Sequence, residues 1–473
     1  MQTKEIKISF VKEILKLLSE EASLLSDPNR KSRELYERAC EVMPGGVTAN
    51  IKYFEPHPIM MEKGKGSKLF DVDGNEYIDY LLCYGALIHG HGNEPVMKAV
   101  YDQLANQGTT IFGTPHDLEV KMAEKLIELY PGIDMVRYTN SGLEATLLAV
   151  RTAMAYTEKD KIAKFEGHYH GGSNQFLLSV NPDIEKSGTE DEPVAVPEST
   201  GISSHEVEHT IILPFNNMDA TERILRKQAD ELAAIILEPV QGGFIPADEE
   251  FIIGLRKLTN ELGILLIFDE VKTGFRTSLG GCQEIFGVKP DLTALGKVLG
   301  GGFPVGAVGG RKDIMMISAP NGGRDILSAG EHSAGKKEIL FHSGTYNGHP
   351  TVLAAGLATI QALEESNQMQ KLCDRTKLLR QKLEEVYQRQ GVDMQTIGMG
   401  SIFNIVLTKE TVKNYRDLQK ANMSLRKVID HELLLQGIYT KPLNRYSMST
   451  AHTEEDIAKT VEIHEKALKK IRG

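Results

Sequence analysis

The sequence predicts an α/β fold, with a large domain around a mostly parallel central sheet and a smaller α+β domain built from both ends of the chain. Six short apolar runs alternate with segments of helical periodicity between residues 110 and 310, which is typical of a parallel sheet covered on both faces. The flanking segments carry a hairpin pattern before this region and helical patterns after it. The length of 473 residues, 41% of them hydrophobic, suffices for two such domains.

The N-terminal segments are expected to form a helical extension and the first part of the smaller domain. Residues 1–30 predict an amphipathic helix, because apolar side chains recur at helical spacing at Val11, Ile14, Leu15 and Leu18. This helix is either a packing arm or a docking element. Residues 31–90 are assigned to the smaller domain, and the alternating pattern of residues 67–81 around the turn at Asp73 predicts a β-hairpin.

The central segment, residues 91–345, is predicted to form the large domain. Thr114 and Pro115 predict the start of a helix, because threonine caps helices and proline suits the first helical position. A second helix is expected to follow the turn at residues 140–142. The predicted strands are residues 135–139, 161–165, 211–213, 233–237, 264–268 and 305–308. Residues 182–204 and 319–338 are rich in loop-forming residues and are expected to be irregular.

The C-terminal segment, residues 346–473, is predicted to complete the smaller domain. It begins with an apolar helix after Pro350 and continues with a charged helix over residues 371–389. A strand-like run at residues 402–407 and two more helices follow. Ligands of open α/β sheets bind beyond the carboxyl ends of the strands, so polar residues that follow predicted strands are the first candidates for a functional site.

The composition argues against several classes of function. The formal net charge is −11, from 54 Lys+Arg against 65 Asp+Glu, which argues against nucleic acid or an anionic membrane as the main partner. The apolar runs are only as long as strands, so no membrane segment is predicted. The four cysteines lie far apart without a CxxC pair, so neither a disulfide framework nor a zinc knuckle is expected. This cysteine usage is typical of the reducing cytoplasm.

No metal or nucleotide motif is complete. Asp71 opens a pattern similar to a calcium loop, but the glycine comes two positions early and the final glutamate is missing. Lys297 precedes several glycines, but a P-loop needs Ser or Thr where this chain has Val298. The histidine pairs at residues 89–91 and 168–170 lack helical spacing and an obvious third ligand. They are therefore expected to be loop histidines, and no metal site is predicted.

Three remaining features together describe one cofactor. The turn at residues 140–142 opens a helix, so its backbone N–H groups can bind a phosphate, although any capped helix would look the same. Asp269 ends a buried strand, where an acid needs a cationic partner. Lys297 lies among apolar and glycine residues, and desolvation makes an amine nucleophilic toward aldehydes. A simple buried ion pair is the alternative, but the combination predicts pyridoxal 5′-phosphate (PLP).

The residues around these features resemble those of class III aminotransferases, which belong to the fold-type-I group of PLP-dependent transferases. The resemblance rests on the runs at residues 266–276, 295–302 and 344–345 and covers about residues 31–473. Within that family it is nearest to the glutamate-1-semialdehyde aminomutases, in the segments at residues 43–47, 71–79, 138–142, 165–172 and 237–240. The resemblance implies the type I fold and a homodimer with shared active sites.

The resemblance also implies roles for individual residues. Lys297 would hold the cofactor covalently and act as general base, and Asp269 would pair with the pyridinium nitrogen. Val271 and Tyr169 would lie against opposite faces of the ring, and Glu238 would be an acid near the substrate. The residues implied to bind the phosphate are Ser141, Gly142, the Leu143 N–H and Thr345 from the neighbouring subunit.

Three positions depart from the family pattern. Leu143 stands where the family usually has a hydroxyl residue, so one side-chain bond to the phosphate is lost. Gly243 stands where the aminomutases usually have Asn, and Lys52 stands where they have the arginine that binds the substrate carboxylate. Lys52 or Arg445 is therefore the expected carboxylate-binding residue. Alternatively, neither contacts a carboxylate, and the substrate is a thioester or a simple amine.

The function expected first is that of a PLP-dependent aminotransferase. It would move an amino group from an amino-acid donor to an oxo or aldehyde acceptor, including at a β- or ω-position, by a ping-pong Schiff-base mechanism. The alternative is glutamate-1-semialdehyde 2,1-aminomutase, which forms 5-aminolevulinate without an external donor. A remote alternative is a non-catalytic PLP-binding or docking protein. The expected partners are small molecules and a second copy of the chain.

Overall fold

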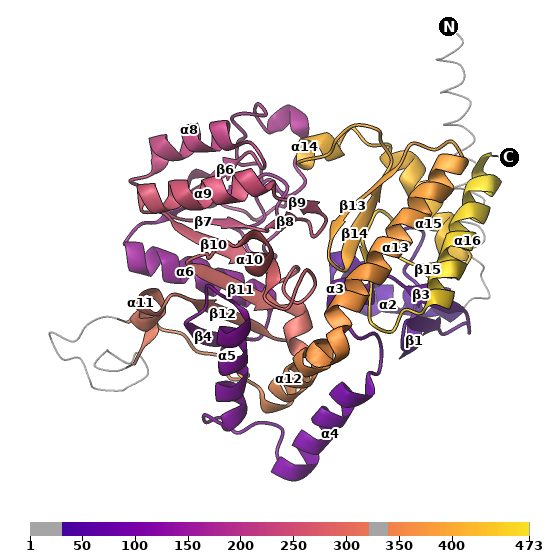
Figure 1. The fold of residues 1–473 in the computed structure, drawn as a ribbon, viewed down its shortest axis with the longest axis horizontal. Coiled ribbons are helices and arrows are strands. Elements are labelled where there is room, and N and C mark those ends of the chain that lie inside the picture. The colour runs from indigo at the N-terminus through magenta and orange to yellow at the C-terminus, as the bar shows by residue number, and fades with distance from the viewer. Residues whose placement is uncertain (1–30, 321–338, 473) are drawn as a thin grey trace, which may run out of the picture.

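A seven-stranded sheet forms the centre of the larger part of the protein (Figure 1). The structure is a computed structural model that describes residues 31–320 and 339–472. The strand order is β4-β12-β11-β10-β7-β5-β6, and only β12 runs antiparallel to its neighbours. The strands are β4 (Met135–Thr139), β5 (Lys161–Phe165), β6 (Thr210–Leu213), β7 (Leu232–Leu237), β10 (Leu265–Asp269), β11 (Leu292–Gly296) and β12 (Gly306–Gly310). The predicted mostly parallel sheet is therefore confirmed.

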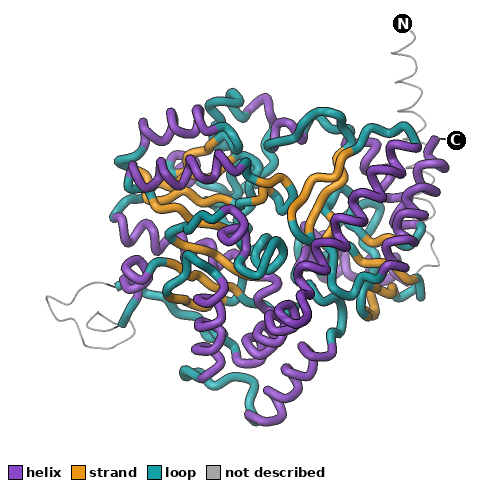
Figure 2. The backbone as a smooth tube through the Cα atoms, viewed as in Figure 1, coloured by secondary structure: helices purple, strands orange, loops and turns teal. Residues whose placement is uncertain are grey.

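Helices cover both faces of this sheet, so its strands are buried on both sides. Alternate residues of β7 enter two separate cores: Ile235 packs in the core that contains Leu255, and Ile236 in the core that contains Ala149. Figure 2 shows the purple helices on the outside of the orange strands. The helices of this region are α5 (Asp117–Leu129), α6 (Gly142–Thr157), α7 (Ser204–Glu208), α8 (Met218–Gln228), α9 (Glu249–Leu262), α10 (Gly281–Phe286) and α11 (Lys312–Met315). A short ribbon of β8 (Val240–Gln241) and β9 (Ile245–Pro246) follows β7.

The start of α5 differs from the prediction made at Thr114. The helix begins at Asp117, after His116 in extended conformation, and Thr114 does not cap it. Asp117 and Glu119 lie in the first turn instead, where acidic side chains interact favourably with the positive end of the helix dipole. The helix predicted after residues 140–142 is confirmed as α6, with Ser141 as its N-cap.

The smaller part of the protein joins both ends of the chain. The predicted hairpin is confirmed as β2 (Lys68–Asp71) and β3 (Glu76–Asp79), and β3 pairs in parallel with β15 (Ile438–Tyr439). The other strands are β1 (Met61–Lys65), β13 (Gln395–Met399), β14 (Ile402–Val406) and β16 (Tyr446–Ser447). The remaining α-helices of the described residues are α2 (Lys31–Val42), α3 (Leu82–Gly85), α4 (Glu94–Gln107), α12 (Pro350–Glu364), α13 (Gln368–Arg389), α14 (Tyr415–Leu418), α15 (Met423–Leu435) and α16 (Glu454–Arg472).

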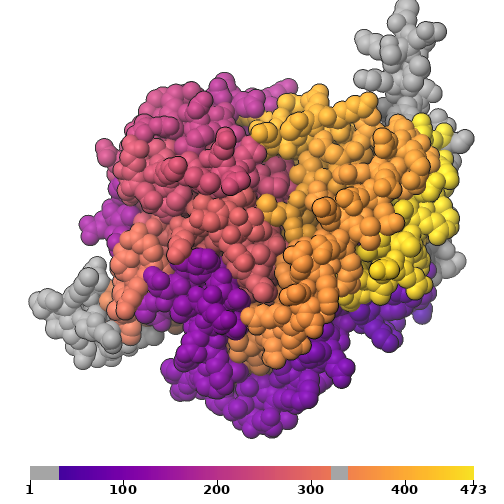
Figure 3. Space-filling model, in the orientation of Figure 1, coloured from indigo at the N-terminus to yellow at the C-terminus, as the bar shows by residue number. Residues whose placement is uncertain are grey.

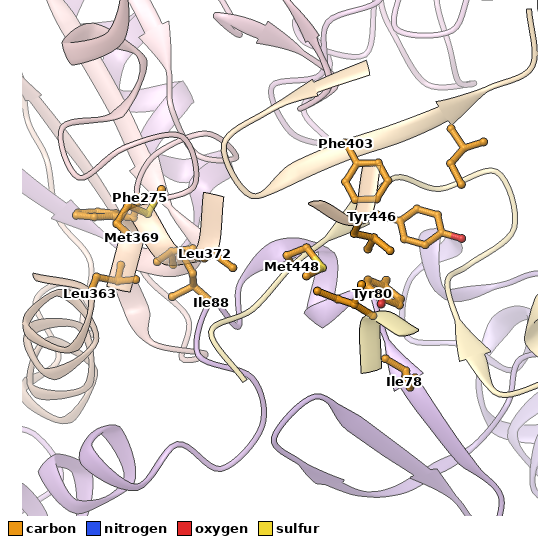
Figure 4. Close-up of a cluster of buried hydrophobic side chains, with 14 of the residues drawn as sticks. Ile78, Tyr80, Ile88, Phe275, Leu363, Met369, Leu372, Phe403, Tyr446 and Met448 are labelled. Carbon is orange, nitrogen blue, oxygen red and sulfur yellow. The ribbon is translucent and has the colours of Figure 1, made fainter. Parts of the chain in front are cut away.

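One apolar core spans the smaller part and continues under the larger one (Figure 4). Tyr80 comes from the N-terminal segment, and its ring centroid lies 5.0 Å from that of Tyr446 in the C-terminal segment. Phe403 stacks on Tyr446 at 5.1 Å. Figure 3 shows the C-terminal residues, in orange and yellow, packed directly against the central residues in magenta and salmon. The predicted α+β part built from both ends of the chain is therefore confirmed.

Some predictions are not tested by the described residues. The helix expected within residues 1–30 and most of the loop expected over residues 319–338 lie outside them. The domain boundaries at residues 90 and 345 stay predictions. Residues 182–204 are irregular as expected, apart from the single turn at Ile184–Lys186 and the first residue of α7. Among the residues that the structure describes, no helix is both long and apolar enough to cross a bilayer.

Candidate active site

The turn between β4 and α6 is fixed by its own hydrogen bonds. Ser141 Oγ accepts a hydrogen bond from the Glu144 N–H at 3.2 Å, and Glu144 Oε2 accepts one from the Asn140 N–H at 2.8 Å. The first N–H groups of a helix have no partner within the helix, so those of Gly142 and Leu143 can bind an anion. The Ser141 hydroxyl accepts the capping bond and keeps its own hydrogen available as a donor.

Two glycines let the ends of three strands approach one another at this turn. A Cβ atom added to Gly142 would lie 2.5 Å from Val271 Cγ1. A Cβ atom added to Gly296 would lie 3.3 Å from both Gly142 Cα and Val271 Cγ1. Val271 follows β10 and Gly296 ends β11, just before Lys297. The carboxyl ends of β10 and β11 therefore meet the start of α6, which is the position expected for a ligand site in such a sheet.

Asp269 ends β10 and is almost fully buried, with 3% of its surface exposed. Its Oδ2 atom lies 2.7 Å from His170 Nδ1, and its Oδ1 atom accepts a hydrogen bond from the Val271 N–H at 3.0 Å. Thr146 Oγ1 donates to the His170 carbonyl at 2.7 Å and so helps to hold this loop. His170 Nε2 is buried and has no hydrogen-bond partner among residues 31–320 and 339–472.

Lys297 follows β11 with a φ of 48°, in the left-handed region. Burial lowers the pKa of this amine from 10.5 to about 8, and the carboxylates of Asp269 and Glu238 oppose the shift. No hydrogen bond joins Lys297 Nζ to another described residue. The amine is therefore available for reaction, and the neutral fraction at pH 7, about a tenth, is far larger than that of an ordinary lysine.

Glu238 and Tyr169 lie together beyond β7. Glu238 Oε2 accepts hydrogen bonds from the Tyr169 N–H at 2.9 Å and the Gly242 N–H at 3.2 Å. Burial raises the pKa of the Glu238 carboxyl above its ordinary value. The Tyr169 side chain is 47% exposed, so its ring is accessible to a ligand.

A buried lysine supports the loop that carries Tyr169. Lys164, on β5, has no exposed surface, and its Nζ donates to the His168 carbonyl at 3.0 Å and to the Leu178 carbonyl. His168 Nδ1 accepts a hydrogen bond from the Glu238 N–H at 3.0 Å. His168 and His170 lie in the loop after β5, as expected, and both are buried and hydrogen-bonded within the site.

The residues expected to bind the substrate lie in different surroundings. Lys52 Nζ donates to Thr48 Oγ1 at 2.7 Å on an exposed turn. Arg445 is partly buried, and its Nε atom has no hydrogen-bond partner within the described part of the chain. Burial lowers the pKa of Arg445. Thr345 lies in an exposed turn.

The arrangement fits a phosphorylated pyridine aldehyde. The glycine-lined turn provides N–H donors for a phosphate, and Val271 forms an apolar wall beside it. Asp269 provides a buried carboxylate for a protonated ring nitrogen, and Lys297 provides an amine for the aldehyde. The structure thus brings together Ser141, Gly142, Leu143, Asp269, Val271 and Lys297. Tyr169 and Glu238 join this group because Tyr169 donates to Glu238 and precedes His170, which contacts Asp269. Thr345 and Lys52 lie outside this group.

The fold and this site define a PLP-type transferase, and comparison with known proteins identifies the family. The sequence model of the family "Aminotransferase class-III" matches residues 51–468. The chain belongs to the class-III aminotransferase family.

Relatives of two kinds resemble the chain over most of its length. A glutamate-1-semialdehyde 2,1-aminomutase from Ignicoccus hospitalis is 42% identical and covers 93% of this chain and 99% of its own. The crystal structure of an omega-transaminase from Sphaerobacter thermophilus is 36% identical, with a TM-score of 0.88 over 94% of this chain and 99% of its own. A transaminase with PLP bound is 32% identical, with a TM-score of 0.82 over 93% of this chain and 97% of its own.

Sequence reasoning missed three residues of the site. His170, which contacts Asp269, occurs in a pair without metal-ligand spacing, and no local signal assigns it to an acid 99 positions away. Lys164 lies within a predicted strand, Lys272 lies just after one, and both are buried. A lysine at such a position without an acidic residue directly beside it in the sequence is the signal that could have found them.

Proposed function

We propose that the chain binds PLP at this site and uses Lys297 as its covalent attachment point and proton carrier. When bound, PLP supplies an electron sink that stabilises negative charge on the substrate carbon. Ser141, Gly142 and Leu143 bind the phosphate, and Val271 and Tyr169 enclose the ring. Asp269 holds a proton on the ring nitrogen, and its contact with His170 keeps the carboxylate in place. Lys297 Nζ, with its pKa of about 8, takes and returns a proton at the substrate carbon.

We further propose that the reaction is the isomerisation of glutamate-1-semialdehyde to 5-aminolevulinate. The observation that carries this proposal is the 42% identity to an aminomutase over 93% of the chain, combined with the intact pair Lys297 and Asp269. The transfer from an external donor, expected first from the sequence, becomes the second candidate. A non-catalytic role is disfavoured because both residues are present and the Asp269 carboxylate acts electrostatically on the Lys297 amine.

The second candidate, an aminotransferase that uses an external donor, is favoured by specific observations. Gly243 and Lys52 differ from the usual aminomutase residues at the substrate side. The omega-transaminase from Sphaerobacter thermophilus has a TM-score of 0.88 with this chain. Both candidates use the same proposed PLP residues and differ in whether the amino group comes from the substrate itself.

One assay separates the two candidates. Glutamate-1-semialdehyde is added alone to the PLP-loaded protein, and 5-aminolevulinate is measured over many turnovers. The aminomutase proposal expects sustained formation without a donor, and Lys297→Ala serves as the inactive control. Formation that requires an added amino-acid donor supports the aminotransferase instead and contradicts the aminomutase proposal.

We also propose that two copies of the chain share their active sites, with Thr345 bound to the phosphate in the partner subunit. Support comes from the exposed turn that carries Thr345, where the neighbouring Tyr346 side chain is 61% exposed. This turn borders a cavity of about 570 Å³ whose lining includes Asn140 and Glu144 of the phosphate turn. A cytoplasmic location is proposed as well, and the four free cysteines support it.

A further inference from the structure

A buried lysine beside the proposed site has no role in the function described above. Lys272 follows Val271 in the loop after β10, and only 5% of its surface is exposed. Its Nζ donates to the Tyr84 carbonyl at 2.7 Å. No carboxylate forms an ion pair with this amine in the described part of the chain. A lysine is almost never buried in this way unless a negative group pairs with it.

The side chain of Lys272 lies against residue 243, and it can do so because that residue is glycine. A Cβ atom added to Gly243 would lie 2.9 Å from Lys272 Cγ and 3.6 Å from Arg445 Nε. The two cationic side chains therefore both lie close to Gly243. An asparagine at this position, as is usual in the aminomutases, would displace Lys272.

Arg445 carries, close to Gly243, a nitrogen that has no hydrogen-bond partner among the residues described. This atom, Nε, is buried. Burial and the nearby charge of Arg445 lower the pKa of Lys272 well below its ordinary value. The cations Lys297 and Arg276 add to this effect, and the Glu238 carboxylate opposes it. Cations thus outnumber acids around Lys272, and an incoming anion would relieve their repulsion.

The backbone fixes the position of the Lys272 amine. Leu82, Cys83 and Tyr84 have φ values of 46°, 52° and 56°, in the left-handed region that is unfavourable for residues other than glycine. This strained turn aims the Tyr84 carbonyl at Lys272 Nζ, and a Cβ atom added to Gly85 would lie 2.6 Å from that nitrogen. Backbone strain of this kind occurs at sites where it positions a functional group.

We propose that Lys272 and Arg445 together bind a carboxylate of the substrate next to Gly243, and that Lys272 determines substrate specificity. The substrate class is an amino or oxo acid rather than a thioester or a simple amine. Lys52 is not required, because its amine is engaged by Thr48 on an exposed turn. This inference rests on the proposed amine chemistry of the site, and it holds for both candidate reactions.

The test compares an acidic amine with its neutral analogue in a single half-reaction. PLP-loaded protein is mixed with 4-aminobutanoate or with butylamine, and the absorbance change of the cofactor is followed. In Lys272→Met, the half-saturating concentration of 4-aminobutanoate is expected to rise about 10- to 100-fold, as for the loss of a charge-assisted hydrogen bond. The maximal rate with either amine and the half-saturating concentration of butylamine are expected to stay within about threefold.

Three further measurements keep the test decisive. Lys441→Met removes another nearby positive charge, that of a partly exposed amine which donates to the Ile51 carbonyl, and no selective loss is expected. Gly243→Asn keeps both cations but displaces Lys272, so it should reproduce the selective loss even if Lys272→Met folds poorly. Calorimetric titration with glutarate, which carries no reactive group, should show binding to the wild-type protein that weakens about 10-fold or more in Lys272→Met.

The proposal is overturned if the wild-type protein does not bind glutarate, or if Lys272→Met affects both amines equally or neither. An equal selective loss in Lys441→Met would also overturn it, because the effect would then be general electrostatics. These outcomes are independent of the proposed reaction. If the protein forms no 5-aminolevulinate but Lys272→Met shows the selective loss, only the aminomutase proposal is refuted. If the protein forms 5-aminolevulinate but Lys272→Met shows no selective loss, only this inference is refuted.

Discussion

At the scale of single residues, the site depends on a carboxylate that the protein shields from water. Asp269 is 3% exposed and lies 2.7 Å from His170 Nδ1. A carboxylate held in this way does not need to reorient when charge develops on a bound ligand. Electrostatic stabilisation is strongest when the stabilising group is already in place. The role proposed for Asp269 is therefore to keep the ring nitrogen protonated, and not to transfer a proton itself.

Replacing Asp269 by asparagine tests this role. Asp269→Asn keeps the size and can keep the contact with His170, but removes the negative charge. We expect kcat to fall by about 10²- to 10³-fold, as for the loss of one strong electrostatic contact in an active site. PLP affinity should fall much less, because the phosphate contacts remain. The measurements are steady-state kinetics and a PLP titration, and a near-normal kcat would remove Asp269 from this role.

Residues that act through their own strand or turn could be predicted, and residues that act through distant contacts could not. Asp269 and Lys297 follow recognisable strand-like runs, and Ser141 has the pattern of a helix cap. His170 acquires its function only through an acid on another strand, and Lys272 through its close approach to Gly243 and Arg445. Such pairings depend on how the loops pack, which local sequence patterns do not encode.

At the scale of elements, close packing between the start of α6 and the loop after β10 shapes the phosphate site. Gly142→Ala places a methyl group 2.5 Å from Val271 Cγ1, so we expect a loss of about 1–3 kcal/mol in the free energy of unfolding and weaker PLP binding. In a Val271→Ala background the clash is relieved, and the penalty of Gly142→Ala should shrink. Denaturant unfolding of the four proteins measures this, and equal penalties in both backgrounds would contradict the packing account.

The strand β5 carries a second element-scale prediction through Lys164. Burial lowers the pKa of Lys164 from 10.5 to about 7, against the opposing charges of Glu238, Glu198 and Glu166. Between these pH values the unfolded chain binds more protons at this lysine than the folded chain, so its contribution makes the free energy of unfolding rise with pH. Below about pH 7 both states are protonated and the contribution no longer changes.

Lys164→Met should remove this contribution. The free energy of unfolding of the wild-type protein minus that of Lys164→Met is expected to increase between about pH 7 and pH 9.5. Urea unfolding of both proteins, in the same cofactor state at each pH, gives this difference and cancels the titration of groups common to both. A difference that stays constant or decreases with pH would show that the pKa of Lys164 is not lowered in the folded protein.

At the scale of the whole molecule, alternation of apolar runs and helices was sufficient to predict the architecture. Six of the seven strands of the large sheet follow from runs of apolar residues. The sequence does not predict β11, because threonine, alanine and glycine in Leu292–Gly296 carry little local preference, and burial between β10 and β12 decides its conformation. The parallel pairing of β3 with β15 also has no local signal, because it joins the two ends of the chain.

Shared active sites predict a specific result for mixed dimers. Lys297→Ala and Thr345→Val homodimers should each be impaired, the first inactive and the second with PLP affinity lowered about 10-fold by the loss of one hydrogen bond to phosphate. A purified heterodimer of the two chains should regain one intact site, because Lys297 of one chain would then meet Thr345 of the other. Its activity per dimer should be about half that of the wild type. A heterodimer without an intact site would contradict sharing.

The most direct test of the account is to locate the lysine that holds PLP. The protein is loaded with PLP, reduced with borohydride, digested, and the modified peptide is identified by mass spectrometry. The account predicts modification of Lys297, none in Lys297→Ala, and faster loading as the pH rises through about 8, where the buried amine loses its proton. Modification at Lys272 or another lysine, or no stable labelling of the wild-type protein, would contradict the central claim.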